Sequence, residues 1–241
     1  MTVSETSRVR SRRVTAGSGL LAAAVALSVG STAPSSMAQG DTSSQRDLAL
    51  IAAAGRGDAD AVRRFLGEGA SVHAADARGV TALIAAAYGN HLQAAELLVR
   101  AGADVNRQDV TQQSAFLIAT SDGYLELLRL TLAAGADVHR TDSYNGTGLI
   151  RAADRGHVEI IRELLKTGIK LDHVNRLGWT ALLEAIILGN GGARHTEVVR
   201  LLVAAGANVN LADGNGVTPL AHARSRGFAA IASILEQAGA R

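Results

Sequence analysis

The chain has 241 residues, of which 47% are hydrophobic but only 3% aromatic, and it contains 26 Gly and 2 Pro. Thin helices that pack closely through Ala and end at Gly give this profile, whereas a β-sandwich does not. The chain has no Cys, which excludes disulfides, Cys-ligated zinc and a thiol nucleophile.

The formal net charge of +2 is unevenly distributed along the chain. Arg8, Arg10, Arg12 and Arg13 lie in the first thirteen residues, beside a single acid, Glu5. Subtracting them from totals of 24 basic and 22 acidic side chains leaves 20 and 21 in the rest of the chain. Nucleic-acid binding needs clustered Lys and Arg, so no nucleic-acid partner is expected.

Residues 1–38 are predicted to be a secretory signal peptide. A basic segment ends at Arg13, an apolar stretch covers 20–29, and a small-residue cleavage site ends at Ala38. The apolar stretch is much shorter than the roughly 20 residues that span a bilayer, so no stable membrane anchor is expected. The predicted location is therefore the periplasm or the exterior of the cell, with cleavage after Ala38.

The export route stays open between two alternatives. Ser11-Arg12-Arg13 before an Ala- and Gly-rich stretch resembles a twin-arginine signal, but Thr15 and Ala16 replace its usual Phe and Leu. The general secretory route is the other possibility. Residues 39–46 are expected to be a polar linker.

A repeat of about 33 residues then runs to the end of the chain. Glycines followed by a small or apolar residue recur at steps of 33, 33, 33, 38 and 33 residues, at Gly69, Gly102, Gly135, Gly168, Gly206 and Gly239. Three further markers keep this phase: a hydroxyl residue (Thr81, Ser114, Thr147, Thr180, Thr218), an Asp or Asn five residues before it, and a Gly or Asn nine residues after it. Such self-similarity indicates a repeat architecture.

Each marker has a physical role in a helix pair. The hydroxyl residue can cap the first helix, and the Gly or Asn nine residues later suits the turn to the second helix. Ala pairs such as Ala86-Ala87 let first helices approach closely, and Leu pairs such as Leu97-Leu98 give the second helix its apolar stripe. One unit cannot bury this stripe alone and is stable only when it is stacked on others.

These segments resemble the ankyrin repeat family. Thr218-Pro-Leu-Ala-His-Ala and Gly156-His-Val-Glu-Ile-Ile-Arg-Glu-Leu-Leu are similar to the ankyrin consensus. The resemblance covers 44–241 and implies an all-α solenoid of helix-turn-helix units joined by β-hairpin loops. The expected units are 44–76, 77–109, 110–142, 143–175, 176–213 and 214–241, of which the first and last are caps. The segment 175–186 also resembles a subgroup of short exported proteobacterial ankyrin proteins.

Three departures from the consensus leave the local loop geometry open. Gln112 and Asn145 stand where a Gly is usual, and Asn tolerates a left-handed backbone better than Gln does. Gly168 is followed by Ile169 rather than by Ala.

The family resemblance implies binding of another protein through a concave groove, lined by the loop tips and the exposed faces of the first helices. Transferred by repeat position, the variable groove residues lie four, three and one residues before the marker hydroxyl and seven and eight residues after it. Tyr88 in repeat 2 and Val110 in repeat 3 are among them, and the most distinctive ones are in repeats 4 and 5. The residues expected to bind the partner are Tyr144, Asp154, Arg155, Arg176, Leu177, Trp179, Glu184, Ile187 and Leu188.

Repeat 5 allows two interpretations. Tyr144, Leu177 and Trp179 could form an anchor patch, because aromatic side chains dominate binding hot spots. Alternatively, the five-residue insertion at 190–194 could fold over Ile187 and Leu188 as a small local core. Glu184, a carboxylate in an apolar helix, either faces the groove or recognises a basic group on a ligand.

No catalytic motif, metal site or cofactor fingerprint is found in the sequence. His91, His157 and His195 share one repeat position with Tyr124 and Phe228, which indicates packing rather than metal binding. The leading prediction is therefore a non-catalytic, monomeric protein-binding module. The alternatives are a small-molecule receptor or enzyme with a pocket at the insertion, and, from the resemblance alone, an accessory factor for a periplasmic redox enzyme such as catalase.

Overall fold

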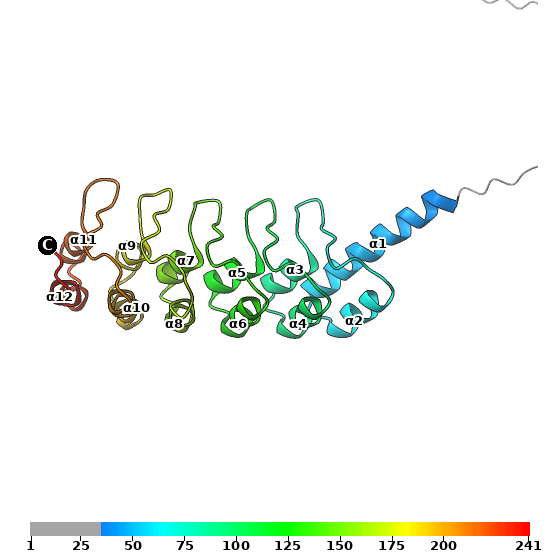
Figure 1. The fold of residues 1–241 in the computed structure, drawn as a ribbon, viewed down its shortest axis with the longest axis horizontal. Coiled ribbons are helices and arrows are strands. Elements are labelled where there is room, and N and C mark those ends of the chain that lie inside the picture. The colour runs from blue at the N-terminus through cyan, green and yellow to red at the C-terminus, as the bar shows by residue number, and fades with distance from the viewer. Residues whose placement is uncertain (1–34) are drawn as a thin grey trace, which may run out of the picture. The chain divides into compact units, whose positions relative to one another are not determined.

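The computed structural model describes residues 35–241, so the predicted signal peptide lies largely outside the described residues. The described residues form twelve α-helices in six consecutive pairs (Figure 1). The pairs are α1 (Ser35–Gly55) with α2 (Ala59–Gly67), α3 (Ala82–Tyr88) with α4 (Leu92–Arg100), α5 (Ala115–Asp122) with α6 (Leu125–Ala133), α7 (Gly148–Arg155) with α8 (Val158–Leu164), α9 (Ala181–Ile187) with α10 (Ala193–Ala204), and α11 (Pro219–Ser225) with α12 (Ala229–Gln237).

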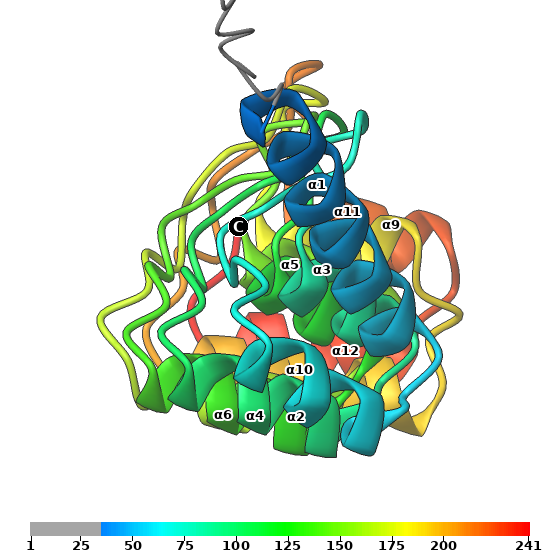
Figure 2. The ribbon, with the colours of Figure 1, turned by 90° about the vertical axis from the view of Figure 1, so that its right-hand side faces the viewer.

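The pairs stack side by side into an all-α solenoid, as the repeat pattern predicts. The first helices form one row and the second helices form a parallel row. The long loops project from the row of first helices, on the side that faces away from the second helices (Figures 1 and 2). From α3 to α11, each first helix packs on the next, as α5 does on α7 and α7 on α9. Within residues 35–241 the loops carry only two isolated β-bridges, Ala75 with Thr81 and Thr141 with Thr147, and no strand.

The core runs continuously through the stack. The paired alanines of the first helices, such as Ala86-Ala87 and Ala152-Ala153, have no solvent exposure, and neither do Leu98, Ile161 and Leu202 of the second helices. Burying one such Leu or Ile side chain stabilises the fold by about 1.5–3 kcal/mol. Because these side chains are buried against neighbouring repeats, each unit depends on the next for its stability.

The marker hydroxyls cap the first helices, as predicted. Each accepts a hydrogen bond from the backbone N–H three residues later, at 3.2–3.5 Å. The five caps are Thr81, Ser114, Thr147, Thr180 and Thr218. Each cap satisfies one of the N–H groups that a helix start leaves without a partner.

The Asp or Asn marker closes each long loop at its tip. In repeat 4, Asp142 Oδ1 accepts hydrogen bonds from the backbone N–H groups of Tyr144 and Gly146, both at 2.8 Å. The same two bonds form at Asp76, Asp109, Asn175 and Asp213. The marker is therefore a structural residue that holds the loop tip in one conformation.

Gln112 and Asn145 preserve this loop although they are not glycine. Both adopt a left-handed backbone, with φ of 61° and 58°, at the position held by Gly79, Gly178 and Gly216 in other repeats. The loop hydrogen bonds around them remain intact. A left-handed conformation costs a non-glycine residue about 1–2 kcal/mol, which the surrounding loop bonds offset.

The turn after α8 differs from its equivalents. Gly69, Gly102, Gly135, Gly206 and Gly239 are left-handed after their second helices, but Gly168 is not. Ile169 takes the place of the usual Ala and is only 6% exposed. The large side chain thus enters the core by a different turn.

Residues 39–46, expected to be a polar linker, are instead helical. They belong to α1, whose 21 residues also include the predicted cleavage site at Ala38. Thr42, Ser43, Ser44 and Gln45 are exposed, whereas Leu50, Ala53 and Ala54 are fully buried. The polar residues 42–45 thus form an exposed part of the first helix, ahead of its buried part.

The insertion in repeat 5 lengthens the turn and the second helix. Gly191, rather than Gly189, adopts the left-handed backbone, and α10 begins two residues before His195. In repeats 2 and 4 the second helix instead begins one residue after the equivalent His. His195 keeps its place, because its Nε2 lies 2.9 Å from the Asp154 carbonyl oxygen.

Candidate functional site

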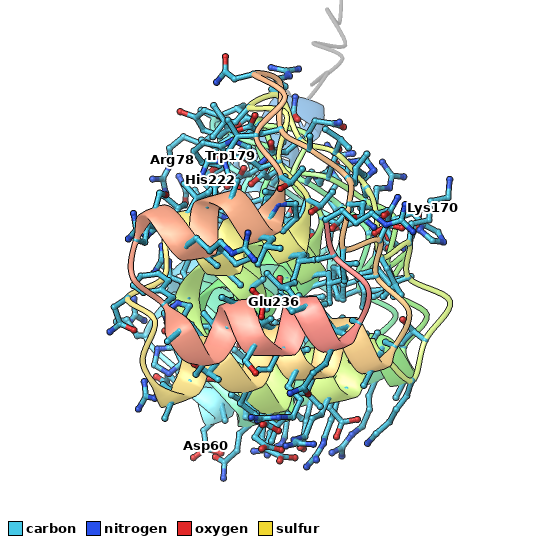
Figure 3. All side chains as sticks on the ribbon, turned by 90° about the vertical axis from the view of Figure 1, so that its left-hand side faces the viewer. Asp60, Arg78, Lys170, Trp179, His222 and Glu236 are labelled. Atoms are coloured by element: carbon cyan, nitrogen blue, oxygen red, sulfur yellow. The ribbon has the colours of Figure 1, made fainter. Side chains whose placement is uncertain are left out.

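Exposed apolar side chains follow the predicted groove. The described residues include seven large apolar side chains that are exposed, and five of them occupy predicted groove positions. These five are Tyr88, Val110, Tyr144, Leu177 and Leu188, with exposed fractions of 47–70%. Seen along the solenoid, Arg78, Trp179 and His222 lie on one side of the loops and Lys170 on the other (Figure 3).

Three of these side chains surround a small cavity between repeats 4 and 5, which we call the repeat 4–5 pocket. Its volume is about 150 Å³. Tyr144, Leu177 and Leu188 are the exposed apolar residues of its lining, with exposed fractions of 61%, 51% and 50%. The remaining lining residues are Asp142, Gly146, Ile150, Arg151, Asn175 and Glu184.

Arg151 is the cation of this pocket and it is already paired. Its Nε lies 3.5 Å from Asp142 Oδ2, and its Nη1 lies 4.0 Å from Asp154 Oδ2. Asp154 also pairs with Arg155, at 3.6 Å. Asp142 is only 4% exposed, so its pair with Arg151 compensates a largely buried charge.

Glu184 lines the same pocket but is only 4% exposed. Its Oε1 accepts a hydrogen bond of 2.6 Å from Asn175 Nδ2. Burial raises the pKa of Glu184 to about 7, and the negative charge of Asp154 adds to this effect. The hydrogen bond from Asn175 and the positive charge of Arg151 lower the pKa, but by less. Glu184 therefore changes its charge near neutral pH.

Glu184 also explains why the loop marker of repeat 5 is Asn. In repeats 4 and 6 the loop Asp faces a basic residue nine positions later: Asp142 with Arg151, and Asp213 with His222 at 2.8 Å. In repeat 5 the same spacing joins Asn175 to Glu184. An Asp at position 175 would place two carboxylates within hydrogen-bond distance, whereas Asn donates to Glu184.

The structure brings together four of the predicted binding residues, namely Tyr144, Leu177, Glu184 and Leu188. The others do not line the pocket: Asp154, Trp179 and Ile187 are partly buried, and Arg155 and Arg176 are exposed. The prediction missed Asp142, Ile150, Arg151 and Asn175, whereas Gly146 is a predicted groove position that was not among the expected binding residues. Arg151 shares its repeat position, four residues after the marker hydroxyl, with Glu184 and His222. This position holds an ionisable residue in three repeats, and that pattern could have identified Arg151.

The insertion does not cover Leu188, which is half exposed. The Gly189 carbonyl accepts a hydrogen bond from Arg226 Nη2 at 2.9 Å, and Gly191 lies directly beside the Phe228 ring. The insertion therefore packs toward repeat 6. A hollow of about 240 Å³ beside it is lined by Arg155, Asn190, Gly192, Ala193, Arg194 and His195.

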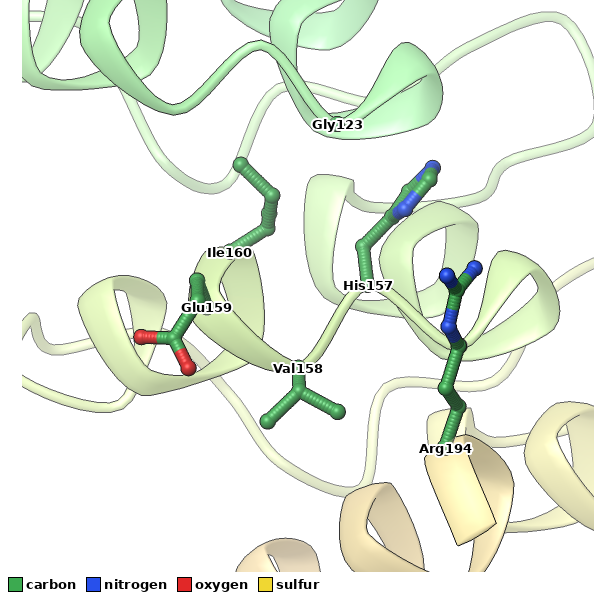
Figure 4. A pocket seen from close by; sticks show the side chains of 7 residues that line it. Gly123, His157, Val158, Glu159, Ile160 and Arg194 are labelled. Atoms are coloured by element: carbon green, nitrogen blue, oxygen red, sulfur yellow. The ribbon is translucent and has the colours of Figure 1, made fainter. Parts of the chain in front are cut away.

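The shared His position serves packing between repeats. His157 Nε2 lies 3.0 Å from the Ser121 carbonyl oxygen, and burial lowers the pKa of this imidazole. Its ring points toward the turn at Gly123, beside a hollow of about 310 Å³ that Arg194 also lines (Figure 4). His91 and His195 contact the preceding repeat in the same way.

Residues 35–241 hold neither a cluster of metal-binding side chains nor a helix suited to span a membrane. No group of three or more His, Cys, Asp or Glu residues there could hold a metal ion. None of the helices α1–α12 combines the length and the apolar character that crossing a membrane requires.

Comparison with known proteins identifies the family. The family model of ankyrin repeats (3 copies) matches residues 20–109 and 116–213. This chain belongs to the ankyrin repeat family, whose repeats are generally modules for binding other proteins.

Individual relatives agree with this assignment. YahD, an ankyrin repeat protein of Escherichia coli (strain K12), is 51% identical over 59 residues, which cover 24% of this chain and 29% of YahD. An ankyrin repeat domain of Acinetobacter baumannii AYE is 50% identical with a TM-score of 0.78, covering 80% of this chain and 98% of that one. The ankyrin repeat protein EF0377 is 33% identical with a TM-score of 0.75, covering 78% and 96% of the two chains.

Proposed function

We propose that this protein is exported and binds another protein through the groove of repeats 4 and 5. The observation that carries the proposal is the convergence of Tyr144, Leu177 and Leu188, each at least half exposed, around one pocket with a polar floor. Exposed apolar side chains that gather around polar groups are typical of binding sites, whereas scattered ones need no explanation. The groove positions of repeats 2 and 3 add Tyr88 and Val110 to the same face.

The size of the pocket favours a protein over a small molecule. Small-molecule sites usually enclose about 300–1,000 Å³, and the repeat 4–5 pocket is about half of the lower limit. It would accept one side chain of a partner, while the neighbouring groove contacts the rest. A few anchor residues of this kind supply most of the affinity of a protein interface.

The binding site is tested by affinity capture with wild-type protein and with Tyr144→Ser and Leu177→Ser variants. Both side chains are more than half exposed, so each change should leave the free energy of unfolding within about 0.5 kcal/mol of wild type. Lys170→Ser, on the other side of the loops, is the matched control. Loss of one protein from both groove variants, but not from the control, supports the groove; equal capture by all of them refutes it.

Export is proposed from the amino-terminal pattern of basic, apolar and small residues. Mass spectrometry of protein recovered from the periplasm or medium tests it directly. A mature amino terminus at Gln39 is expected, and a chain that stays in the cytoplasm with residues 1–38 attached would contradict export.

A further inference from the structure

We propose that the repeat 4–5 pocket binds a basic side chain, Arg or Lys, of the partner protein. This inference rests on the proposed function and names the chemistry of its anchor. It follows from three properties of the pocket: its apolar rim, its acidic floor, and an oxygen of that floor that accepts no hydrogen bond from the described part of the chain.

The rim suits the stem of a long basic side chain. Arg and Lys bury their methylene groups on apolar surfaces while the charged end seeks polar groups. Tyr144, Leu177 and Leu188 offer such a surface at the mouth of the pocket. The Tyr144 ring also offers a face to a cation, and cation–π contacts favour Arg and Lys over neutral side chains.

The floor is more acidic than it is basic. Asp142 and Glu184 line the pocket together with one cation, Arg151, which also pairs with Asp154. Glu184 itself forms no ion pair with any residue of the described chain, in contrast to Asp142 and Asp213 at the equivalent contacts. An added positive charge would therefore meet a carboxylate that pairs with no basic side chain of residues 35–241.

The second oxygen of Glu184 is available to such a charge. Oε1 is occupied by Asn175, but Oε2 accepts no hydrogen bond from residues 35–241. Within the same residues, no buried side-chain oxygen or nitrogen lacks a hydrogen-bond partner. Oε2 must therefore touch the open space of the pocket, where a guanidinium or ammonium group could donate to it.

The surroundings of Glu184 make this binding depend on pH. Asp142 and Asn175 face it from the loops, Arg151 and Asp154 from α7, and His222, paired with Asp213, holds the equivalent position on α11. With a pKa of about 7, the carboxyl group is mostly protonated at pH 5.5 and mostly ionised at pH 8. A cation binds the ionised form, so its affinity should rise over this interval.

The test is an NMR titration of the full mature chain with Nα-acetyl-arginine amide. Nα-acetyl-citrulline amide, which has nearly the same shape without the charge, and Nα-acetyl-leucine amide are the comparison probes. The amide signals of Gly146, Leu177 and Leu188 report on the pocket. We expect these signals to shift when the arginine probe is added. The citrulline probe should bind at least about tenfold more weakly, and the arginine probe should itself bind at least about tenfold more weakly at pH 5.5 than at pH 8.

Two variants complete the test. Glu184→Gln should bind the arginine and citrulline probes equally and lose the pH dependence, while Glu159→Gln, an exposed acid on α8, should behave as wild type. Tighter binding of the leucine probe, or arginine shifts that survive unchanged in Glu184→Gln, would overturn the inference. If the inference about the anchor is overturned but Leu177→Ser still fails to capture the partner, the proposed function stands with an apolar anchor. If Leu177→Ser captures the partner as well as wild type does, the inference and the proposed function are both overturned.

Discussion

Replacing Glu184 by Gln should stabilise the protein at alkaline pH and leave its stability unchanged in acid. The carboxyl has a pKa near 4.5 in the unfolded chain and about 7 in the fold. Below pH 4.5 both states are protonated, so the group makes no difference to stability. Between pH 4.5 and 7 the folded state holds the proton that the unfolded state has released, and stability falls as pH rises.

A shift of this size corresponds to about 3 kcal/mol at 1.36 kcal/mol per pKa unit, and solvent at the pocket mouth reduces it to about 2. Gln keeps an oxygen that accepts from Asn175 but has no charge to bury. Denaturant unfolding of both proteins from pH 4 to pH 8 should therefore show a difference that grows from near zero to about 2 kcal/mol. A constant difference across the range, or a less stable Gln variant at pH 8, would refute the reasoning; Glu159→Gln, on the exposed surface of α8, controls for loss of a carboxylate.

Three further outcomes follow from contacts in the structure. Asn175→Asp should destabilise the protein by about 2 kcal/mol at pH 8, because it places a carboxylate beside Glu184. Adding Glu184→His, which copies the Asp213–His222 pair, should recover most of this loss in a double-mutant cycle. If the effects of the two substitutions on the free energy of unfolding simply add, the proposed pairing is wrong. Gln112→Gly should raise the free energy of unfolding by about 1 kcal/mol by relieving a left-handed backbone at φ 61°, and a loss of stability would show that the Gln side chain contributes contacts of its own. Leu98→Ala should cost about 2–5 kcal/mol, since Leu98 is fully buried, and a thermal melt with a smaller loss would contradict the continuous core.

The repeat pattern predicts the fold because each marker is a local device. A hydroxyl that caps the next helix, and an Asp that closes a loop of five residues, act within a few positions of the sequence. Their spacing therefore reports the geometry directly. The same argument shows the His position to be a packing position, since His157 contacts the preceding repeat 36 residues away at a constant phase.

The pocket could be predicted only in part. Tyr144, Leu177 and Leu188 are exposed, and they stand at repeat positions that the register assigns to the predicted groove. The sequence does not show that the loop marker contacts the side chain nine positions later. The pairing of Asn175 with Glu184 is therefore seen only in the three-dimensional structure. The path of the insertion toward Phe228 depends on tertiary packing that composition does not show. The polar composition of 39–46 suggests a linker and gives no sign that α1 already includes these residues.

Photo-crosslinking in living cells tests the groove of repeats 4 and 5 most directly. A p-benzoylphenylalanine in place of Leu177 stands at the mouth of the repeat 4–5 pocket, and the same residue in place of Glu159 stands on the exposed surface of α8. The groove position should give a discrete adduct with one protein, which disappears when Tyr144→Ser is added, while the α8 position gives none. Adducts of equal yield from both positions, or only from α8, would contradict recognition through this groove.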